Sequence, residues 1–101
     1  MTKTTLYIGL NDKDSKTQKI NTVEAIKILT NLLVDVGGAT IYNATGIYTH
    51  ENGEIIIENT LRVELFDIGL QAIKNKIELI KQVLNQESII LQQENTNTTI
   101  L

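Results

Sequence analysis

Residues 46–64, GIYTHENGEIIIENTLRVE, carry the strongest structural signal in the chain. Runs rich in β-branched residues lie on both sides of Asn52-Gly53. Asn-Gly is the strongest short-range sign of a β-hairpin, because a two-residue type I′ turn needs positive φ at both positions. The stretch therefore predicts a long hairpin, with strands over residues 39–50 and 54–66.

The predicted turn also predicts which side chains share a face of the hairpin. One face is expected to hold the pairs His50–Ile55, Tyr48–Ile57, Gly46–Asn59, Ala44–Leu61 and Tyr42–Val63. The other is expected to hold Thr49–Ile56, Ile47–Glu58, Thr45–Thr60, Asn43–Arg62 and Ile41–Glu64. A bulge near Gly46 would shift the far half of this register by one residue. The first face is mostly apolar and is expected to pack on the core.

The segment before the hairpin predicts one strand and one helix. TLYIGL at residues 5–10 alternates in the manner of a strand. Asn21, followed three residues later by Glu24, forms a capping-box pattern at the start of a helix. Gly37 and Gly38 are expected to end that helix, one of them in the left-handed conformation.

The segment after the hairpin predicts a second helix and a last strand. Asp67 is expected to cap the helix, whose apolar stripe is formed by Leu70, Ile73, Ile77, Ile80 and Leu84. Residues 88–93, SIILQQ, are expected to form the strand.

The resulting β-α-β-β-α-β order is that of an α+β, ferredoxin-like sandwich. It predicts a four-stranded antiparallel sheet with two helices on one face and a long hairpin between the second and third strands. We expect a single domain over residues 1–94 and a polar C-terminal tail over residues 95–101. The other sheet face would be bare, with Ile41, Ile47 and Ile56 among polar residues, and a bare mixed face is typical of a subunit contact. We therefore expect a homo-oligomer, a dimer or higher.

Composition excludes several classes of function. Nine basic residues stand against twelve acidic ones, for a net charge of −3, which argues against nucleic-acid binding. The chain has no cysteine and no apolar stretch typical of a signal peptide or membrane span, so a cytoplasmic protein without membrane contact is expected. The absence of proline and the abundance of Ile, Asn, Lys and Thr suggest a low-GC bacterium or its phages.

His50 and Glu58 are the first candidates for a site. His50 is the only histidine and could act as a general base with Glu58, or bind a phosphate. It could equally be a solvated residue beside the turn. Tyr48, with Tyr7 and Tyr42, could stack on a ring of a ligand or could simply pack.

Arg62 is the only arginine and is suited to a bidentate contact with a carboxylate or phosphate. It lies between Glu58 and Glu64 on one strand face, so the three could also form an ion-pair ladder, within the sheet or between subunits, that is worth little if exposed. Lys13 and Lys16, with Lys19, could form a mobile flap beside a cleft, or belong to a solvated loop. DKDSKT at 12–17 resembles the start of a calcium loop but lacks its glycine and its final glutamate, so no metal is expected.

The segments LYIGL and GGATIYNATGIYTHENGEIIIENTLRVEL resemble a family of small bacterial domains of unknown function, the DUF3574 type. The matching positions are Gly9, Leu10, Gly38, Thr40, Ala44, Gly46, Gly53, Ile55 and Glu58. The resemblance covers about half of the chain. It implies a dimer-forming ferredoxin-like fold and brings no established activity.

Three hypotheses follow. The first is an oligomeric module, without cofactor, that binds a small anionic, nucleotide-like molecule or a host protein. Its candidate residues are Arg62, Glu58, Tyr48, His50, Lys13 and Lys16. Such a module could be a phage or mobile-element accessory protein with an anti-defence role. The second is a small ferredoxin-like enzyme using His50 and Glu58, and the third is a purely structural assembly subunit.

Overall fold

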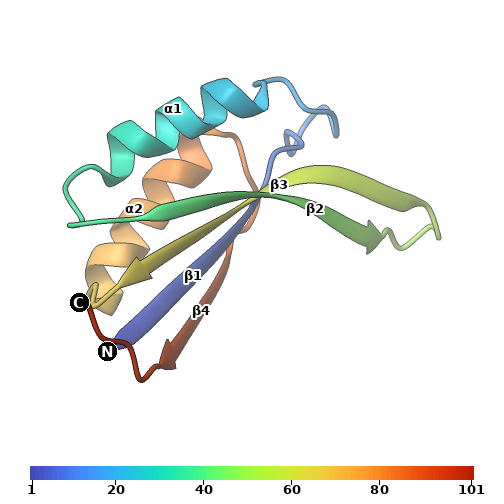
Figure 1. Ribbon diagram of the computed structural model, residues 1–101. Helices are drawn as coiled ribbons and strands as arrows, with labels where there is room; N and C mark the ends of the chain where they lie inside the picture. Colours follow the sequence, from blue (N-terminus) through green and yellow to red (C-terminus); the bar gives the residue numbers. More distant parts are fainter.

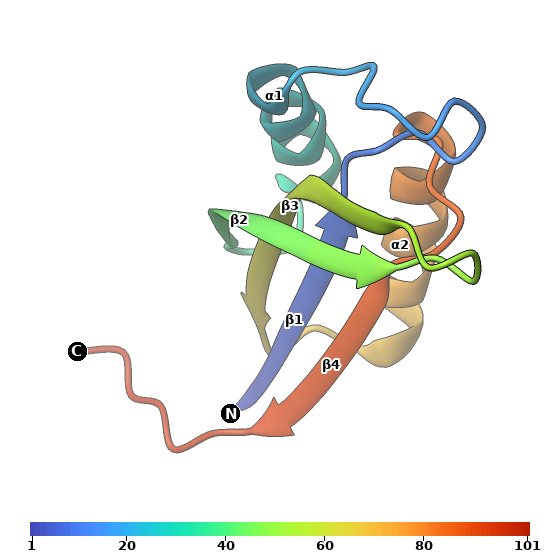
Figure 2. The same ribbon diagram turned by 90° about the vertical axis from the view of Figure 1, so that its right-hand side faces the viewer.

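A computed structural model describes residues 1–101 and has the predicted order of elements. The elements are β1 (Thr2–Gly9), α1 (Thr22–Leu33), β2 (Thr40–Thr49), β3 (Ile55–Phe66), α2 (Leu70–Val83) and β4 (Ile90–Asn95). The strands form one antiparallel sheet in the order β2-β3-β1-β4, and both helices cover the same face (Figures 1 and 2). The predicted ferredoxin-like sandwich is confirmed.

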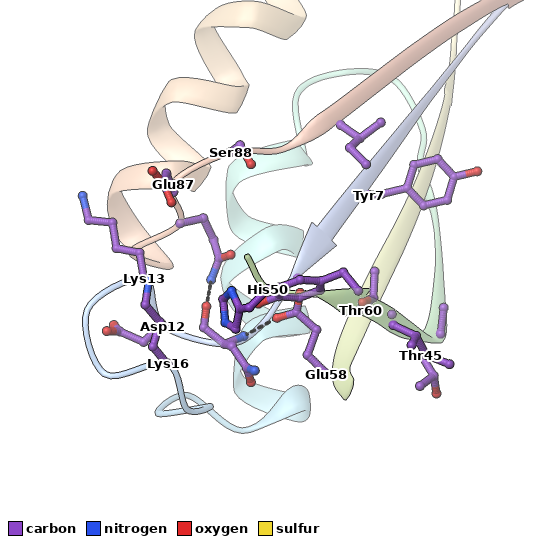
Figure 3. A pocket seen from close by; sticks show the side chains of 18 residues that line it. Tyr7, Asp12, Lys13, Lys16, Thr45, His50, Glu58, Thr60, Glu87 and Ser88 are labelled. Atoms are coloured by element: carbon purple, nitrogen blue, oxygen red, sulfur yellow. Dashed lines mark hydrogen bonds between the residues drawn. The ribbon is translucent and has the colours of Figure 1, made fainter. Parts of the chain in front are cut away.

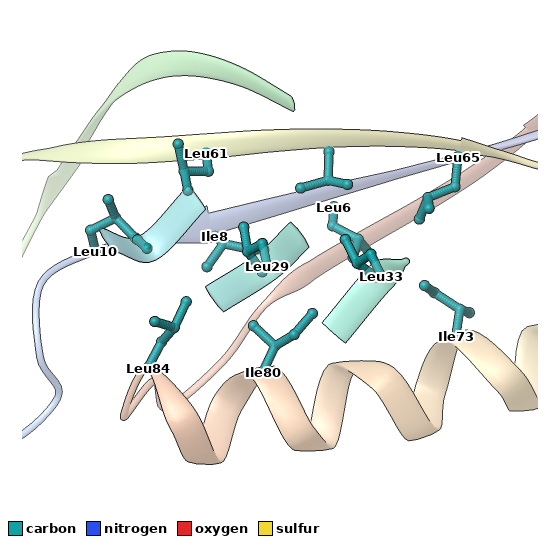
Figure 4. Close-up of a cluster of buried hydrophobic side chains, with 12 residues drawn as sticks. Leu6, Ile8, Leu10, Leu29, Leu33, Leu61, Leu65, Ile73, Ile80 and Leu84 are labelled. Atoms are coloured by element: carbon teal, nitrogen blue, oxygen red, sulfur yellow. The ribbon is translucent and has the colours of Figure 1, made fainter. Parts of the chain in front are cut away.

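The core lies between that sheet face and the helices (Figure 4). Alternate residues of the central strands point into it, among them Leu6 and Ile8 of β1 and Leu61 and Val63 of β3, all fully buried. Removing such a side chain from water contributes about 1.5–3 kcal/mol each. The helices contribute the buried residues Ala25, Leu29, Leu33, Ile73 and Ile80, and Leu84 follows at the C-cap of α2.

The two helices begin differently. The Asn21 side chain accepts a hydrogen bond from the Glu24 amide at 2.8 Å, so the predicted N-cap of α1 is confirmed. The predicted cap of α2 is wrong, because the N-cap is Gly69 and has no capping side chain. Asp67 lies before it in a left-handed conformation (φ 53°) and accepts a hydrogen bond from the Thr2 amide at 2.8 Å. Its side chain thus holds the start of β1.

The hairpin loop is one residue longer than the sequence predicted. The His50 amide donates to the Glu54 carbonyl at 2.8 Å, so residues 51–53 form the loop. Among them only Gly53 has positive φ, at 84°, which is the left-handed residue of a three-residue loop rather than a type I′ turn. Asn52 instead uses its side chain, which accepts a hydrogen bond from the Glu54 amide at 2.9 Å.

This extra residue shifts the register of β2 against β3 by one position, so each β2 side chain lies on the face opposite to the predicted one. Tyr48 lies opposite Ile56 instead of Ile57, and Arg62 lies opposite Tyr42 instead of Asn43. The predicted register is therefore wrong by one residue along its whole length, and no bulge occurs near Gly46.

We call the sheet face without helices the open face. The observed register places different β2 residues on this face from those predicted. Ile41 and Ile47 were expected there, but both belong to the helix side, where Ile41 packs against the core. Tyr42 and Tyr48, expected on the core side, are on the open face and are 40% and 41% exposed. Glu58, Thr60, Arg62 and Glu64 of β3 stay on the open face, as predicted.

The hairpin extends well beyond the helices (Figure 1). On its helix side Ile47 and Ile57 form a cross-strand pair and are 70% and 66% exposed, and Ile55 beside them is 65% exposed. These isoleucines therefore form an apolar surface that no helix of the chain covers.

The loop between β1 and α1 is folded onto the connection between α2 and β4. Asp12, 8% exposed, accepts hydrogen bonds from the amides of Asp14 and Ser15, each at 3.0 Å, and from the Asn85 side chain at 2.7 Å. The Lys13 amide donates to the Asn85 carbonyl at 3.0 Å. These bonds hold the loop in place, so the lysine-bearing segment is not an untethered flap.

Neither helix is long and apolar enough to cross a membrane.

Replacing Asp12 by Ala should loosen this loop while leaving the sheet intact. Hydrogen bonds from Ser15 and then Asn85 lower the pKa of Asp12 from 3.8 to about 2. A carboxylate with a lowered pKa stabilises the folded state fully above its ordinary pKa, and this contribution is lost as the pH falls through the folded-state value. Urea unfolding should therefore show a stability difference between wild type and Asp12→Ala at neutral pH that shrinks as the pH falls toward 2.

Hydrogen exchange provides the local check, since the Asp14 and Ser15 amides should lose protection in Asp12→Ala. Asp35→Ala is the matched control, because Asp35 pairs with Lys76 at 2.7 Å and has no bond to this loop. Equal loss of protection in both variants would contradict the assignment.

Candidate functional site

A cavity of about 630 Å³ opens on the open face near the end of β1 (Figure 3). Its walls come from β1, the hairpin strands, the β1–α1 loop and the α2–β4 connection. This is within the usual size of a pocket for a small molecule. We call it the hairpin pocket.

Glycines at two strand positions make room for the floor of the hairpin pocket. A Cβ at Gly9 would collide with the Glu58 carboxylate, and one at Gly46 would lie 2.6 Å from the Thr60 hydroxyl oxygen. Neither glycine has a left-handed backbone, so both are needed for space rather than for conformation. A glycine within a strand often marks such a close approach.

Glu58 lies on this floor and is half-buried. Its Oε2 accepts a hydrogen bond from the Asn11 amide at 3.0 Å (Figure 3). No lysine, arginine or histidine forms an ion pair with it. A carboxylate partly removed from water is most stable beside a positive charge or several donors, so the hairpin pocket presents an uncompensated negative charge at its centre.

Tyr48 and His50 lie next to Glu58 because of the corrected register. Their rings meet edge-on, with centroids 5.4 Å apart. Burial, and then the negative charge of Glu58, raise the pKa of the Tyr48 hydroxyl. The hydroxyl therefore stays protonated at neutral pH and is available as a hydrogen-bond donor.

The two ends of the hairpin pocket differ in character. One end is formed by Tyr7, Ala44 and Ile90 and offers an aromatic ring and apolar atoms. At the other end lie Lys13 and Lys16, from the β1–α1 loop. The cavity thus runs from an apolar end, past a carboxylate, to a basic rim.

Five of the six predicted site residues line this cavity, and one does not. The five are Tyr48, His50, Glu58, Lys13 and Lys16. Their role in binding stays a prediction.

Arg62, the sixth, lies on the open face outside the hairpin pocket. Its guanidinium is 4.2 Å from the centre of the Tyr42 ring, and its Nε is buried without a hydrogen-bond partner.

Within the chain Arg62 forms no ion pair with Glu58 or Glu64, so the ladder considered within the sheet does not form. Glu64 pairs instead with Lys3 at 2.6 Å, and this ammonium, followed by the Tyr42 hydroxyl, lowers the pKa of Glu64. Glu58 is held by backbone, as described above. Arg62 is thus the one basic side chain on this face that a ring, rather than a carboxylate, holds in place.

Two glycines and the α2–β4 connection also shape the cavity, and residues 86–88 of that connection close one wall, which the sequence did not predict. Within it Gln86 is buried and donates to the Asn11 carbonyl at 2.8 Å. Gly9 and Gly46 inside strand patterns were the available signal. The Gln86 contact joins residues 75 positions apart in the sequence, and no local pattern reports it.

The structure holds no group of three His, Cys, Asp or Glu side chains that could bind a metal ion. No protein-family model matches the sequence, and no curated protein matches it either.

Solved structures do match the fold. A phage SAM lyase in its apo state superposes with a TM-score of 0.66 at 19% identity, over 92% of this chain and 78% of that chain. A phage SAM lyase in complex with S-methyl-5′-thioadenosine gives 0.62 at 20% identity, over 92% and 79%. A mutant of CutA1 from Pyrococcus horikoshii OT3 gives 0.61 at 14% identity, over 99% and 87%. At these identities the similarity establishes the fold that this chain shares with them.

Proposed function

We propose that the hairpin pocket binds an adenosyl sulfonium nucleoside, with S-adenosylmethionine as the foremost ligand. The observation that carries the proposal is the Glu58 carboxylate, half-buried at the centre of the cavity without a cationic partner. A sulfonium is a fixed positive charge that can occupy this place. The shared fold with a phage SAM lyase supports the same ligand class.

The apolar end of the hairpin pocket suits the base of such a nucleoside. Tyr7 and Ile90 can contact a flat ring, and stacking of a base on an aromatic side chain is worth about 1–3 kcal/mol. A purely anionic ligand, as the sequence suggested, would meet repulsion from Glu58 at the centre. A nucleoside with a positive charge next to its ribose fits the observed order of groups better.

Glu58→Gln tests the proposal because it removes the charge and keeps the shape. S-adenosylmethionine should bind about 10–100-fold more weakly, corresponding to the loss of about 1.5–3 kcal/mol from a charged contact. S-methyl-5′-thioadenosine has no cationic centre and should bind both proteins with similar affinity. Isothermal titration calorimetry of both ligands against both proteins measures the difference.

Glu54→Gln is the matched control, since Glu54 is exposed, directly follows the hairpin loop and lies outside the cavity. Gly9→Ala is a second, geometric test, because the added Cβ would displace the Glu58 carboxylate and should weaken the sulfonium ligand as Glu58→Gln does. Equal weakening of both ligands would argue against a role for charge. Failure of the wild-type protein to bind either ligand would overturn the proposal.

Turnover of the same ligand is a second candidate function, favoured by Tyr48. Its protonated hydroxyl beside Glu58 can donate to a substrate group while the carboxylate holds the sulfonium. The bond between sulfur and Cγ of the aminobutyrate chain breaks with its electron pair remaining on sulfur, while an oxygen of the chain's own carboxylate forms a bond to that Cγ and closes a lactone. The product on that side is S-methyl-5′-thioadenosine, the ligand in one of the solved lyase structures.

Chromatography of reaction mixtures decides between binding and turnover. Release of S-methyl-5′-thioadenosine that slows in Glu58→Gln and Tyr48→Phe would establish a lyase, and His50→Ala would show whether the histidine takes part. Intact ligand after prolonged incubation would leave a binding module. Either activity would withdraw a nucleotide-type metabolite from the cell, as expected of the phage or mobile-element accessory protein that the composition suggested.

The uncovered hairpin supports a homo-oligomer as part of this proposal. A two-stranded ribbon is marginally stable in water unless it packs against something. Here Ile47, Ile55 and Ile57 are each about two thirds exposed on one side. We assign a second copy of the chain to this surface, which would bury the isoleucines.

Ile57→Ser should shift the protein toward smaller species in native mass spectrometry, because it places a hydroxyl at the centre of the apolar surface. Val34→Ser at the C-terminal end of α1 is the matched control: Val34 is 78% exposed, against 66% for Ile57, and that end of α1 lies far from the hairpin loop (Figure 1). A wild-type protein that is monomeric at all concentrations would contradict the assignment. Equal shifts in both variants would do the same.

A further inference from the structure

Lys13 and Lys16 lie at the rim of the hairpin pocket without an acidic partner. The ion pairs of the structure involve other lysines, namely Lys3, Lys76 and Lys81. Glu87 also lines this end of the cavity but forms no ion pair with either rim lysine (Figure 3). Neither rim lysine is thus engaged in an ion pair, and neither is Glu58 on the floor.

The backbone that bears these lysines is fixed rather than free. The Lys13 amide donates to the Asn85 carbonyl at 3.0 Å, and the Lys16 amide donates to the Asp12 carbonyl at 2.8 Å. Lys16 has a left-handed backbone with φ of 62°, which costs a residue with a side chain about 1–2 kcal/mol. The Asp12 hydrogen bonds described above maintain this conformation. Both side chains thus start from defined positions at the edge of the cavity.

We propose that Lys13 and Lys16 bind the carboxylate of the amino-acid chain carried by the nucleoside. This inference rests on the proposed function and deepens it, since it names the second charged group that the site recognises. A sulfonium nucleoside with an amino-acid chain carries a positive centre and a carboxylate in series. The hairpin pocket presents the complementary charges in series, with Glu58 on the floor and the two ammonium groups at the rim.

This arrangement discriminates between related nucleosides. S-methyl-5′-thioadenosine has neither the sulfonium charge nor the carboxylate, so it gains nothing from Glu58 or from the rim. Arg62 is the other candidate for a carboxylate, but it lies outside the cavity and over Tyr42. Lys13 and Lys16 are the lysines that line the cavity.

The test compares two ligands that differ only in the carboxylate. S-adenosylhomocysteine and its decarboxylated analogue, S-adenosylthiopropylamine, are both thioethers, so neither offers the sulfonium leaving group that turnover would require. Calorimetry should show that the double variant Lys13→Ala/Lys16→Ala binds S-adenosylhomocysteine at least about tenfold more weakly than wild type, as expected for the loss of charged contacts. The decarboxylated analogue should bind both proteins equally.

Lys19→Ala is the matched control, because Lys19 belongs to the same loop, carries the same charge and does not line the hairpin pocket. It should bind S-adenosylhomocysteine as wild type does. Adenosine 5′-monophosphate, measured beside adenosine, tests a phosphate as the alternative anion. A preference for the monophosphate that depends on the rim lysines and exceeds that for S-adenosylhomocysteine would overturn the assignment to a carboxylate.

The remaining outcomes separate this inference from the proposed function. If wild type binds both thioethers and the double variant weakens both or neither, the role of Lys13 and Lys16 is refuted and the nucleoside site stands. If wild type binds neither these thioethers nor S-adenosylmethionine, the proposed function fails and this inference fails with it. If Lys19→Ala lost as much affinity for S-adenosylhomocysteine as the double variant, the effect would come from the net charge of the loop and the assignment to Lys13 and Lys16 would be refuted.

Discussion

The left-handed backbone at Gly53 is the constraint on which the site depends. It closes a three-residue loop, and the length of that loop sets the register of β2 on β3. Because side chains alternate between the faces of a strand, a change of one residue exchanges the two faces. With the observed register Tyr48 and His50 share the open face with Glu58. With a two-residue loop they would have pointed toward the helix side, and the hairpin pocket would not exist.

The fold could be predicted from the sequence because its signals are local. Apolar alternation in residues 5–10, the Asn21 cap and the stripe of α2 each report their own element, and the order of elements limits the topology to very few possibilities. The register could not be predicted so securely. Asn-Gly is compatible both with a type I′ turn, in which both residues have positive φ, and with a longer loop in which only the glycine does. The two residue types alone do not determine which of these backbone conformations forms.

The candidate site was predicted in its residues and not in its arrangement. Lys13 and Lys16 lie more than 40 positions from Glu58 in the sequence. Their loop is joined to the hairpin by the bond from the Asn11 amide to Glu58, and to the distant α2–β4 connection by the bond from Asn85 to Asp12. Arg62 drew attention as a unique residue, although its position over Tyr42 follows only from the true register. The single histidine and single arginine were easy to single out as candidates in the sequence. Tertiary contacts determine which of the candidate side chains line the cavity.

The charges of the hairpin pocket and the rigidity around it have a common origin. Because Gly9 has no side chain, the Glu58 carboxylate can lie over β1. The same carboxylate accepts a hydrogen bond from the Asn11 amide at the start of the lysine-bearing loop. The next residue, Asp12, ties that loop to Asn85. The negative floor and the positive rim are thus held at a fixed separation by one short chain of contacts, from Glu58 through Asn11 to Asp12. A ligand that carries both charges meets a site already organised for it, and therefore loses little binding energy to ordering the protein.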